Sequence, residues 1–162
     1  MSSFTIDRFT QGSEKDVIAL IVPIQREEFG VEISAHDQPD LIDIPSFYQT
    51  GSGDFWLARS QDEVVGTIGM KDIGNDEVAL RKMFVAAPWR GREFGVARQM
   101  LECLIAASKQ RKVKRIYLGT TEKFLAAHRF YEKYGFERID QQDLPVSFPV
   151  MGVDTRFYAL EV

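Results

Sequence analysis

The stretch VAAPWRGREFGVARQML, residues 85–101, passes from the end of an apolar strand pattern through proline, arginine and glycine into a helical repeat of apolar residues. A helix N-terminus exposes unpaired backbone N–H groups and the positive end of the helix dipole. Gly91 and Gly95 let an anion approach that backbone closely, and Arg90 and Arg92 add charge-assisted donors. The stretch predicts a phosphate site at the start of a helix, although glycine in this position is also common in simple turns.

Regular elements are predicted on both sides of this stretch. Upstream, the segments 54–60, 64–73 and 77–85 alternate with polar turns, a spacing typical of an antiparallel meander. Downstream, the apolar residues of 94–111 recur at helical spacing and are followed by a buried strand at 113–120. A strand, a helix and a second strand in this order predict a right-handed crossover.

The rest of the chain adds elements at both ends and shows no linker or repeat. Turn and capping residues mark the ends of these elements, with Ser13 as a helix N-cap and Gly135 just after a helix. We predict a strand at 4–10, a helix at 13–30, a long ordered loop with a short helical turn at 31–53, a second helix at 121–135, and closing strands at 136–140 and 155–162.

Composition limits the class of protein. A length of 162 residues with 44% hydrophobic content predicts one domain, spanning 1–162. Twenty basic and 24 acidic residues give a net charge of −4, which argues against nucleic acid or a membrane surface as a partner. With one cysteine, no secretory leader pattern and no long apolar run, we expect a cytoplasmic protein. We expect no bound metal.

Three motifs together resemble one known family. They are LRKMFV at 80–85, PWRGREFGVA at 88–97 and AAHRFYEKYGF at 126–136. In this order and separation they resemble the GNAT superfamily of acyl-CoA-dependent N-acetyltransferases. The resemblance implies an α/β (α+β) fold, with a mixed, mostly antiparallel sheet of about seven strands that is flanked by helices and splayed between its fourth and fifth strands.

The resemblance also implies acetyl-CoA as the cofactor. In the family, the strand before the loop pairs with the pantetheine arm, and the loop and first helical turn hold the pyrophosphate. Glu93 stands where the family usually has glycine, so we expect its side chain to point to solvent, away from the phosphates. Phe124 replaces a common asparagine. The cofactor-binding residues implied are Met83, Phe84, Val85, Arg90, Gly91, Arg92, Glu93, Phe94, Gly95, Val96 and Phe124.

Two residues are implied in catalysis. Tyr131 matches a family tyrosine near the thioester sulfur and is suited to protonate the leaving thiolate; the alternative is that it only packs in the core. Glu77 matches a place where some members carry a general base, but a solvated strand end, with water as the base, is also compatible with the sequence. Strand alternation predicts that one face carries Glu77, Ala79, Arg81, Met83 and Val85.

The loop at 31–53 corresponds to the region where the family builds its acceptor pocket. Its acidic residues favour a cationic acceptor, whereas Asp and Gln beside a proline also form ordinary turns and caps. The substrate-binding residues that we predict are Asp37, Gln38, Asp40, Tyr48 and Trp56.

The function implied is transfer of an acetyl group from acetyl-CoA to the primary amine of a small amine or amino-acid-like acceptor, by direct attack in a ternary complex. Two alternatives remain. One is acetylation of a protein lysine or N-terminus, which needs an open groove. The other is a non-catalytic acyl-CoA sensor. Family members are often homodimers, so a homodimer is also compatible with the resemblance.

Overall fold

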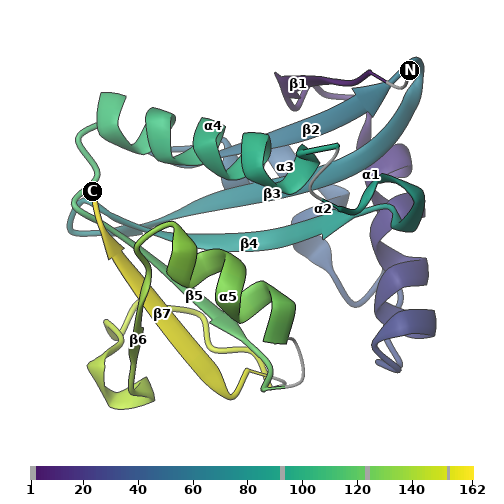
Figure 1. Ribbon diagram of the computed structural model, residues 1–162. Helices are drawn as coiled ribbons and strands as arrows, with labels where there is room; N and C mark the ends of the chain where they lie inside the picture. The colour runs from purple at the N-terminus through teal and green to yellow at the C-terminus, as the bar shows by residue number, and fades with distance from the viewer. Residues whose placement is uncertain (1–2, 92–93, 123–124, 153) are drawn as a thin grey trace.

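The computed structural model describes residues 3–91, 94–122, 125–152 and 154–162. Seven strands form one sheet in the order β1-β2-β3-β4-β5-β7-β6 (Figure 1). Every neighbouring pair is antiparallel except β4 and β5, which are parallel. This mixed, mostly antiparallel sheet confirms the predicted fold. The strands are β1 (Thr5–Arg8), β2 (Asp54–Ser60), β3 (Glu63–Gly74), β4 (Glu77–Val85), β5 (Arg115–Thr120), β6 (Glu137–Ile139) and β7 (Arg156–Glu161).

The two parallel strands separate soon after they begin. Their pairing runs only from Glu77 opposite Arg115 to Ala79 opposite Tyr117. From that point the strands diverge, as Figure 1 shows between β4 and β5. Along 80–85, β4 therefore has a strand neighbour on the β3 side only, within the described part of the chain. The splay predicted between the fourth and fifth strands is confirmed.

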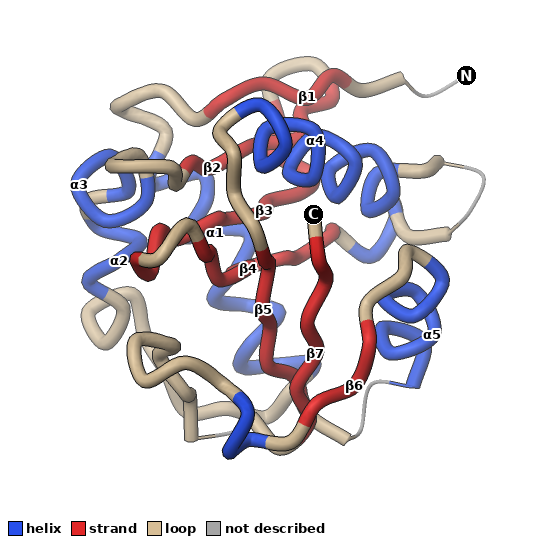
Figure 2. Tube along the Cα trace, turned by 90° about the vertical axis from the view of Figure 1, so that its left-hand side faces the viewer, coloured by secondary structure: helices blue, strands red, loops and turns tan. Residues whose placement is uncertain are grey.

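Helices cover both faces of the sheet (Figure 2). Apolar side chains of α4 and α5 pack with one face, and those of α1, α2 and α3 pack with the other. In the described ranges, no helix has the length and apolar character needed to cross a membrane. The helices are α1 (Glu14–Pro23) with its π-helical continuation η1 (Ile24–Glu28), α2 (Pro39–Ile42), α3 (Ile44–Tyr48), η2 (Ala87–Trp89), α4 (Val96–Gln110), α5 (Leu125–Lys133) and η3 (Gln141–Asp143).

The segment 31–53 is more regular than expected. It contains two short helices instead of one turn, and each has a proline in its first turn. Proline suits this position because its fixed φ is helical and the missing N–H would have no partner there. The Asp43 side chain accepts a hydrogen bond from the Ser46 amide at 3.3 Å and so caps α3. The two short helices therefore form an ordered layer that packs on the sheet.

A β-bulge changes which side chains of β4 share a face. Lys82 has φ +54°, and the pairing with β3 shifts register at this point. Ala79 packs with Tyr117 on the face opposite α4, whereas Met83 and Val85 pack with the cluster beneath α4. The predicted common face is therefore wrong beyond Arg81, because the extra residue of a bulge reverses the alternation of the residues after it.

Candidate active site

The side chain of Tyr131 reaches the splayed part of β4 from α5. Its hydroxyl donates a hydrogen bond to the sulfur of Met83 at 3.5 Å, and its ring packs against Phe136 and Tyr158. Burial raises the pKa of Tyr131 above its ordinary value of 10.0, so the phenol keeps its proton at neutral pH. Two residues that the sequence assigned to the site, Tyr131 and Met83, are thus in direct contact.

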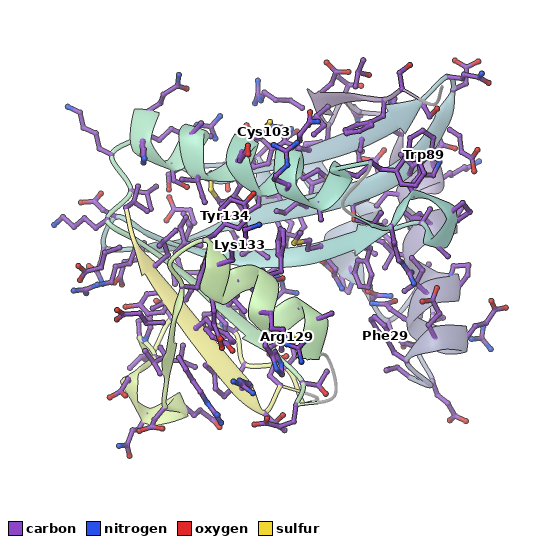
Figure 3. The ribbon with its side chains drawn as sticks, viewed as in Figure 1. Phe29, Trp89, Cys103, Arg129, Lys133 and Tyr134 are labelled. Carbon is purple, nitrogen blue, oxygen red and sulfur yellow. The ribbon has the colours of Figure 1, made fainter. Side chains whose placement is uncertain are left out.

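The N-terminus of α4 lies at the end of the segment that follows β4. The helix begins at Val96, two residues later than predicted, because Gly95 adopts a left-handed conformation with φ +68°. Gly91 also has a positive φ, +117°. The Phe94 ring packs against the Trp89 ring at a tilt, with 5.3 Å between the ring centroids. Figure 3 shows Trp89 beside this end of the helix. The amides of the first turn of α4 have no partner within the helix, which makes this end attractive to an anion.

Arg98 is a candidate anion ligand that the sequence reasoning missed. A Cβ built on Gly95 would lie 3.0 Å from Nη2 of Arg98, so this guanidinium lies next to the glycine at the start of the helix. Its other nitrogen, Nη1, pairs with Glu102 at 3.1 Å. The available signal was the spacing, because a residue three positions after the N-cap glycine lies on the first turn.

Arg90 is engaged with the protein itself. Its Nε donates to the backbone carbonyl of Val85 at 2.8 Å. Its two terminal nitrogens form a bidentate pair with Glu28, at 2.6 and 3.0 Å. The hydrogen bond from Arg90 holds the pKa of Glu28 below its usual value. Arg90 thus links the end of β4 to the π-helical turn after α1. The predicted cofactor residues Arg92, Glu93 and Phe124 lie outside the described residues.

Glu77 lies at the first position of β4, six residues before Met83. Its carboxylate accepts a hydrogen bond from the Tyr117 hydroxyl at 3.0 Å and lies 3.7 Å from Nη1 of Arg115. Glu77 and Arg115 lie opposite each other where β4 and β5 are still paired, away from the splayed part of β4. The role of Glu77 as a base therefore stays a prediction.

Two of the loop residues predicted to bind the acceptor, Asp37 and Gln38, already have partners within the protein. Asp37 accepts from the amide and the hydroxyl of Ser34, both at 3.0 Å. Gln38 forms a buried amide pair with Gln25, at 2.8 and 3.0 Å. Both side chains hold the loop in place, as turn and cap residues do.

Asp40 and Tyr48 form the centre of a buried polar cluster. The Tyr48 hydroxyl donates to Asp40 Oδ2 at 2.6 Å. The same oxygen lies 3.8 Å from Nη2 of Arg81 and 3.8 Å from Nζ of Lys82. Asp40 is therefore already compensated by two cations. Trp56, predicted to share a pocket with Tyr48, packs on the α4 face of the sheet instead.

Asp154 is a second carboxylate near the splay. A Cβ built on Gly119 would lie 2.6 Å from Asp154 Oδ2, so glycine in β5 leaves the space that this carboxylate occupies. The same oxygen accepts from the Met151 amide at 3.1 Å. Burial raises the pKa of Asp154, while that amide and Arg81 oppose the rise. Asp154 comes next to Gly119 through the fold, because the two residues lie far apart in the sequence.

A comparison with protein families identifies one match. The model described as the acetyltransferase (GNAT) family matches residues 18–136. Among curated proteins, an N-acetylaspartate synthetase from Danio rerio is 33% identical over 106 residues, which are 64% of this chain and 37% of that protein. The chain thus spans well under half the length of this relative.

Solved structures match over the whole chain. A GNAT-family acetyltransferase from Staphylococcus aureus Mu50 has a TM-score of 0.91 and 37% identity, covering 98% of this chain and 99% of that one. A GNAT-family acetyltransferase from Elizabethkingia anophelis, solved with acetyl-CoA bound, has a TM-score of 0.66 and 22% identity, covering 100% of both chains. The second match shows the shared fold.

Proposed function

Because this chain belongs to the acetyltransferase (GNAT) family, we propose that it is an acetyl-CoA-dependent N-acetyltransferase acting on a small, amino-acid-like primary amine. The observation that carries the proposal is the contact between Tyr131 and Met83 at the splayed edge of β4. A proton donor there contacts the strand that leads to the α4 N-terminus. We treat residues 1–162 as one acetyltransferase domain; a homodimer stays a prediction.

The residues present fit acetyl-CoA. The edge of β4 along 80–85 has no strand neighbour toward β5 in the described chain, which leaves room for an extended arm to add to the sheet. The first-turn amides of α4, with Gly91, Gly95 and the guanidinium of Arg98, suit a pyrophosphate. The structure with acetyl-CoA bound shares this fold. Phe84, Val85, Phe94 and Val96 complete the predicted contact surface.

When bound, acetyl-CoA supplies an activated acetyl thioester and a thiol leaving group. Tyr131 holds a proton beside the edge of β4 and would pass it to the leaving thiolate; burial, which raises its pKa, keeps the phenol protonated before that step. The acceptor amine must lose a proton before it attacks. Asp154, with a pKa raised by burial, lies beside the splay and is the better-placed carboxylate for this step. Glu77 acting through water is the second candidate.

Two observations favour a small acceptor. The layer formed by α2 and α3 covers the face of the sheet opposite α4 with buried side chains, including Tyr48 and Leu41. The named activity of the Danio rerio relative, synthesis of N-acetylaspartate, also concerns an amino acid. A protein lysine or N-terminus would require an open groove here. The sensor alternative is disfavoured by Tyr131, whose buried hydroxyl is placed for proton donation.

The first test is calorimetric titration of acetyl-CoA into the protein, followed by assay of free thiol release with a panel of amines. S-acetylpantetheine, which lacks the pyrophosphate, serves as the matched ligand that cannot use the α4 N-terminus. We expect micromolar binding of acetyl-CoA, much weaker binding of the short analogue and amine-dependent release. Binding without release for any amine would favour the sensor, and no binding would overturn the proposal.

A further inference from the structure

Arg81 is a partly buried arginine whose hydrogen-bonding capacity is largely unused. Its side chain is 13% exposed, and only Nε donates to an oxygen, the Tyr48 hydroxyl at 3.3 Å. Among the described residues, the hydrogen bond of Nη1 goes to the Met151 sulfur, at 3.9 Å, and Nη2 comes no closer than 3.8 Å to Asp40. A guanidinium whose two terminal nitrogens lack a good acceptor within the protein is available to a ligand.

Two further cations lie near Arg81. Lys82 Nζ approaches the same Asp40 oxygen. Lys71 Nζ lies 4.5 Å from the centre of the Phe47 ring, and the Arg81 guanidinium lies 5.5 Å from it. Asp40 and Asp154 are the carboxylates that act on Arg81. Lys82 therefore offsets part of the negative charge of Asp40 beside Arg81.

A third carboxylate, Asp72, acts on Lys71. Its oxygens accept hydrogen bonds from backbone amides of the adjoining turns, from Ser52 at 3.0 Å and from Gly74 at 2.8 Å. Those bonds and the charge of Lys71 lower the pKa of Asp72. The cations of this cluster are therefore matched by carboxylates, and what distinguishes Arg81 is its unused pair of terminal nitrogens.

Arg81 lies close to the reaction centre along β4. Arg81 lies two residues after Ala79, the last residue of β4 paired with β5, and two residues before Met83, which contacts Tyr131. Strands rise about 3.3 Å per residue, so Arg81 lies roughly 6–7 Å along the strand from Met83. The bulge at Lys82 puts the two side chains on opposite faces of the splayed edge, so a ligand that joins them passes through the gap between β4 and β5. A small molecule carrying an amine and an acidic group spans a distance of this order.

We propose that Arg81 binds a carboxylate of the acceptor, so that the preferred acceptors are small amines that bear a carboxylate. This inference rests on the proposed function and narrows its substrate class. The fork of Nη1 and Nη2 matches a carboxylate in bidentate geometry, and Lys71 and Lys82 add attraction without direct contact. The acidic loop alone favoured a cationic acceptor, but Asp40 is compensated by Arg81 and Lys82, and the unused terminal nitrogens of Arg81 favour an acceptor with a carboxylate.

The test compares matched acceptors that differ only in charge. Glycine is paired with glycinamide and aspartate with asparagine, and kcat/KM is measured by thiol release. We expect the member with the additional carboxylate to be favoured about 10- to 100-fold in at least one pair, the size of a charge-assisted contact. Arg81→Gln should remove the preference mainly through KM, and Arg81→Lys should retain part of it.

Two further variants keep the outcome interpretable. Lys71→Gln removes a neighbouring cation whose contacts are with Phe47, and it should reduce the preference in the same direction if Arg81→Gln fails to fold. Arg138→Gln, which removes an exposed arginine paired with Glu122, serves as the matched charge control. Equal turnover of both members of each pair by the wild type would overturn the inference alone. Loss of acetyl-CoA binding and turnover in the wild type would instead overturn the proposed function.

Discussion

The hydroxyl of Tyr131 on α5 lies 3.5 Å from the sulfur of Met83 on β4, at the part of the sheet where β4 has parted from β5. The contact joins two residues that are 48 positions apart in the sequence. A phenol held there by ring packing faces the edge of β4 and is kept protonated by burial. This relationship leads to the first prediction.

Replacing Tyr131 with phenylalanine should reduce kcat by about 10²- to 10⁴-fold, the range for loss of a general acid. Calorimetric affinity for acetyl-CoA should change little, because the ring remains in place. Tyr134→Phe, in the turn directly after α5, is the matched control, and Figure 3 shows Tyr134 near the C-terminal end of this helix. Undiminished turnover in Tyr131→Phe would show that the tyrosine only packs.

Replacing Gly95 with alanine should weaken acetyl-CoA binding by roughly tenfold, because the new Cβ would crowd Arg98 at the start of α4. A positive φ also strains alanine, at a stability cost of about 1 kcal/mol. Gly74→Ala has a similar backbone cost, with φ +87° and open space around it. Thermal melts should show similar losses for the two variants, and calorimetry should show weaker binding for Gly95→Ala only.

Replacing Glu28 with glutamine should strengthen acetyl-CoA binding by about two- to fivefold, as expected for the release of one exposed ion pair. The change frees the Arg90 guanidinium from its bidentate partner and makes it available to phosphate. The difference from the wild type should shrink as salt is added. Glu27→Gln alters an exposed neighbour and should leave affinity unchanged; weaker binding in Glu28→Gln would show that Glu28 positions Arg90 productively.

Replacing Asp54 with asparagine should destabilise the fold by about 2–3 kcal/mol at pH 7. Asp54 is fully buried and accepts from Arg111 and Arg8, both at 2.7 Å. Burial acts to raise its pKa, but hydrogen bonds from Arg111, Gln49, the Phe55 amide and Arg8 hold the pKa below 3.8.

The pH dependence follows from that lowered pKa. A carboxyl with a lower pKa in the folded state contributes its full stabilisation above its unfolded value, near 3.9, and loses it as the pH falls through the folded value. Denaturant titrations from pH 7 to pH 2 should therefore show wild type and Asp54→Asn converging below about pH 4. The exposed Asp62→Asn should track the wild type throughout, and a constant gap for Asp54→Asn would contradict this account.

The sequence by itself determined the order of the elements and the glycine-rich entry to α4, because these features depend on local periodicity and turn residues. The splay and the role of Tyr131 were implied by the resemblance of its motifs to the GNAT superfamily. The helix boundaries were less accurate because a left-handed Gly95 and the prolines of 31–53 set them through backbone geometry.

Only the tertiary structure decided which charges meet. Arg81 contacts Tyr48 across 33 positions and Arg90 pairs with Glu28 across 62, and no local pattern encodes either pair. The bulge at Lys82 reversed the faces of Met83 and Val85 because strand alternation holds only where pairing is regular. Burial then set the charge balance of the site, since ionic partners inside a fold are chosen by packing and not by spacing along the chain.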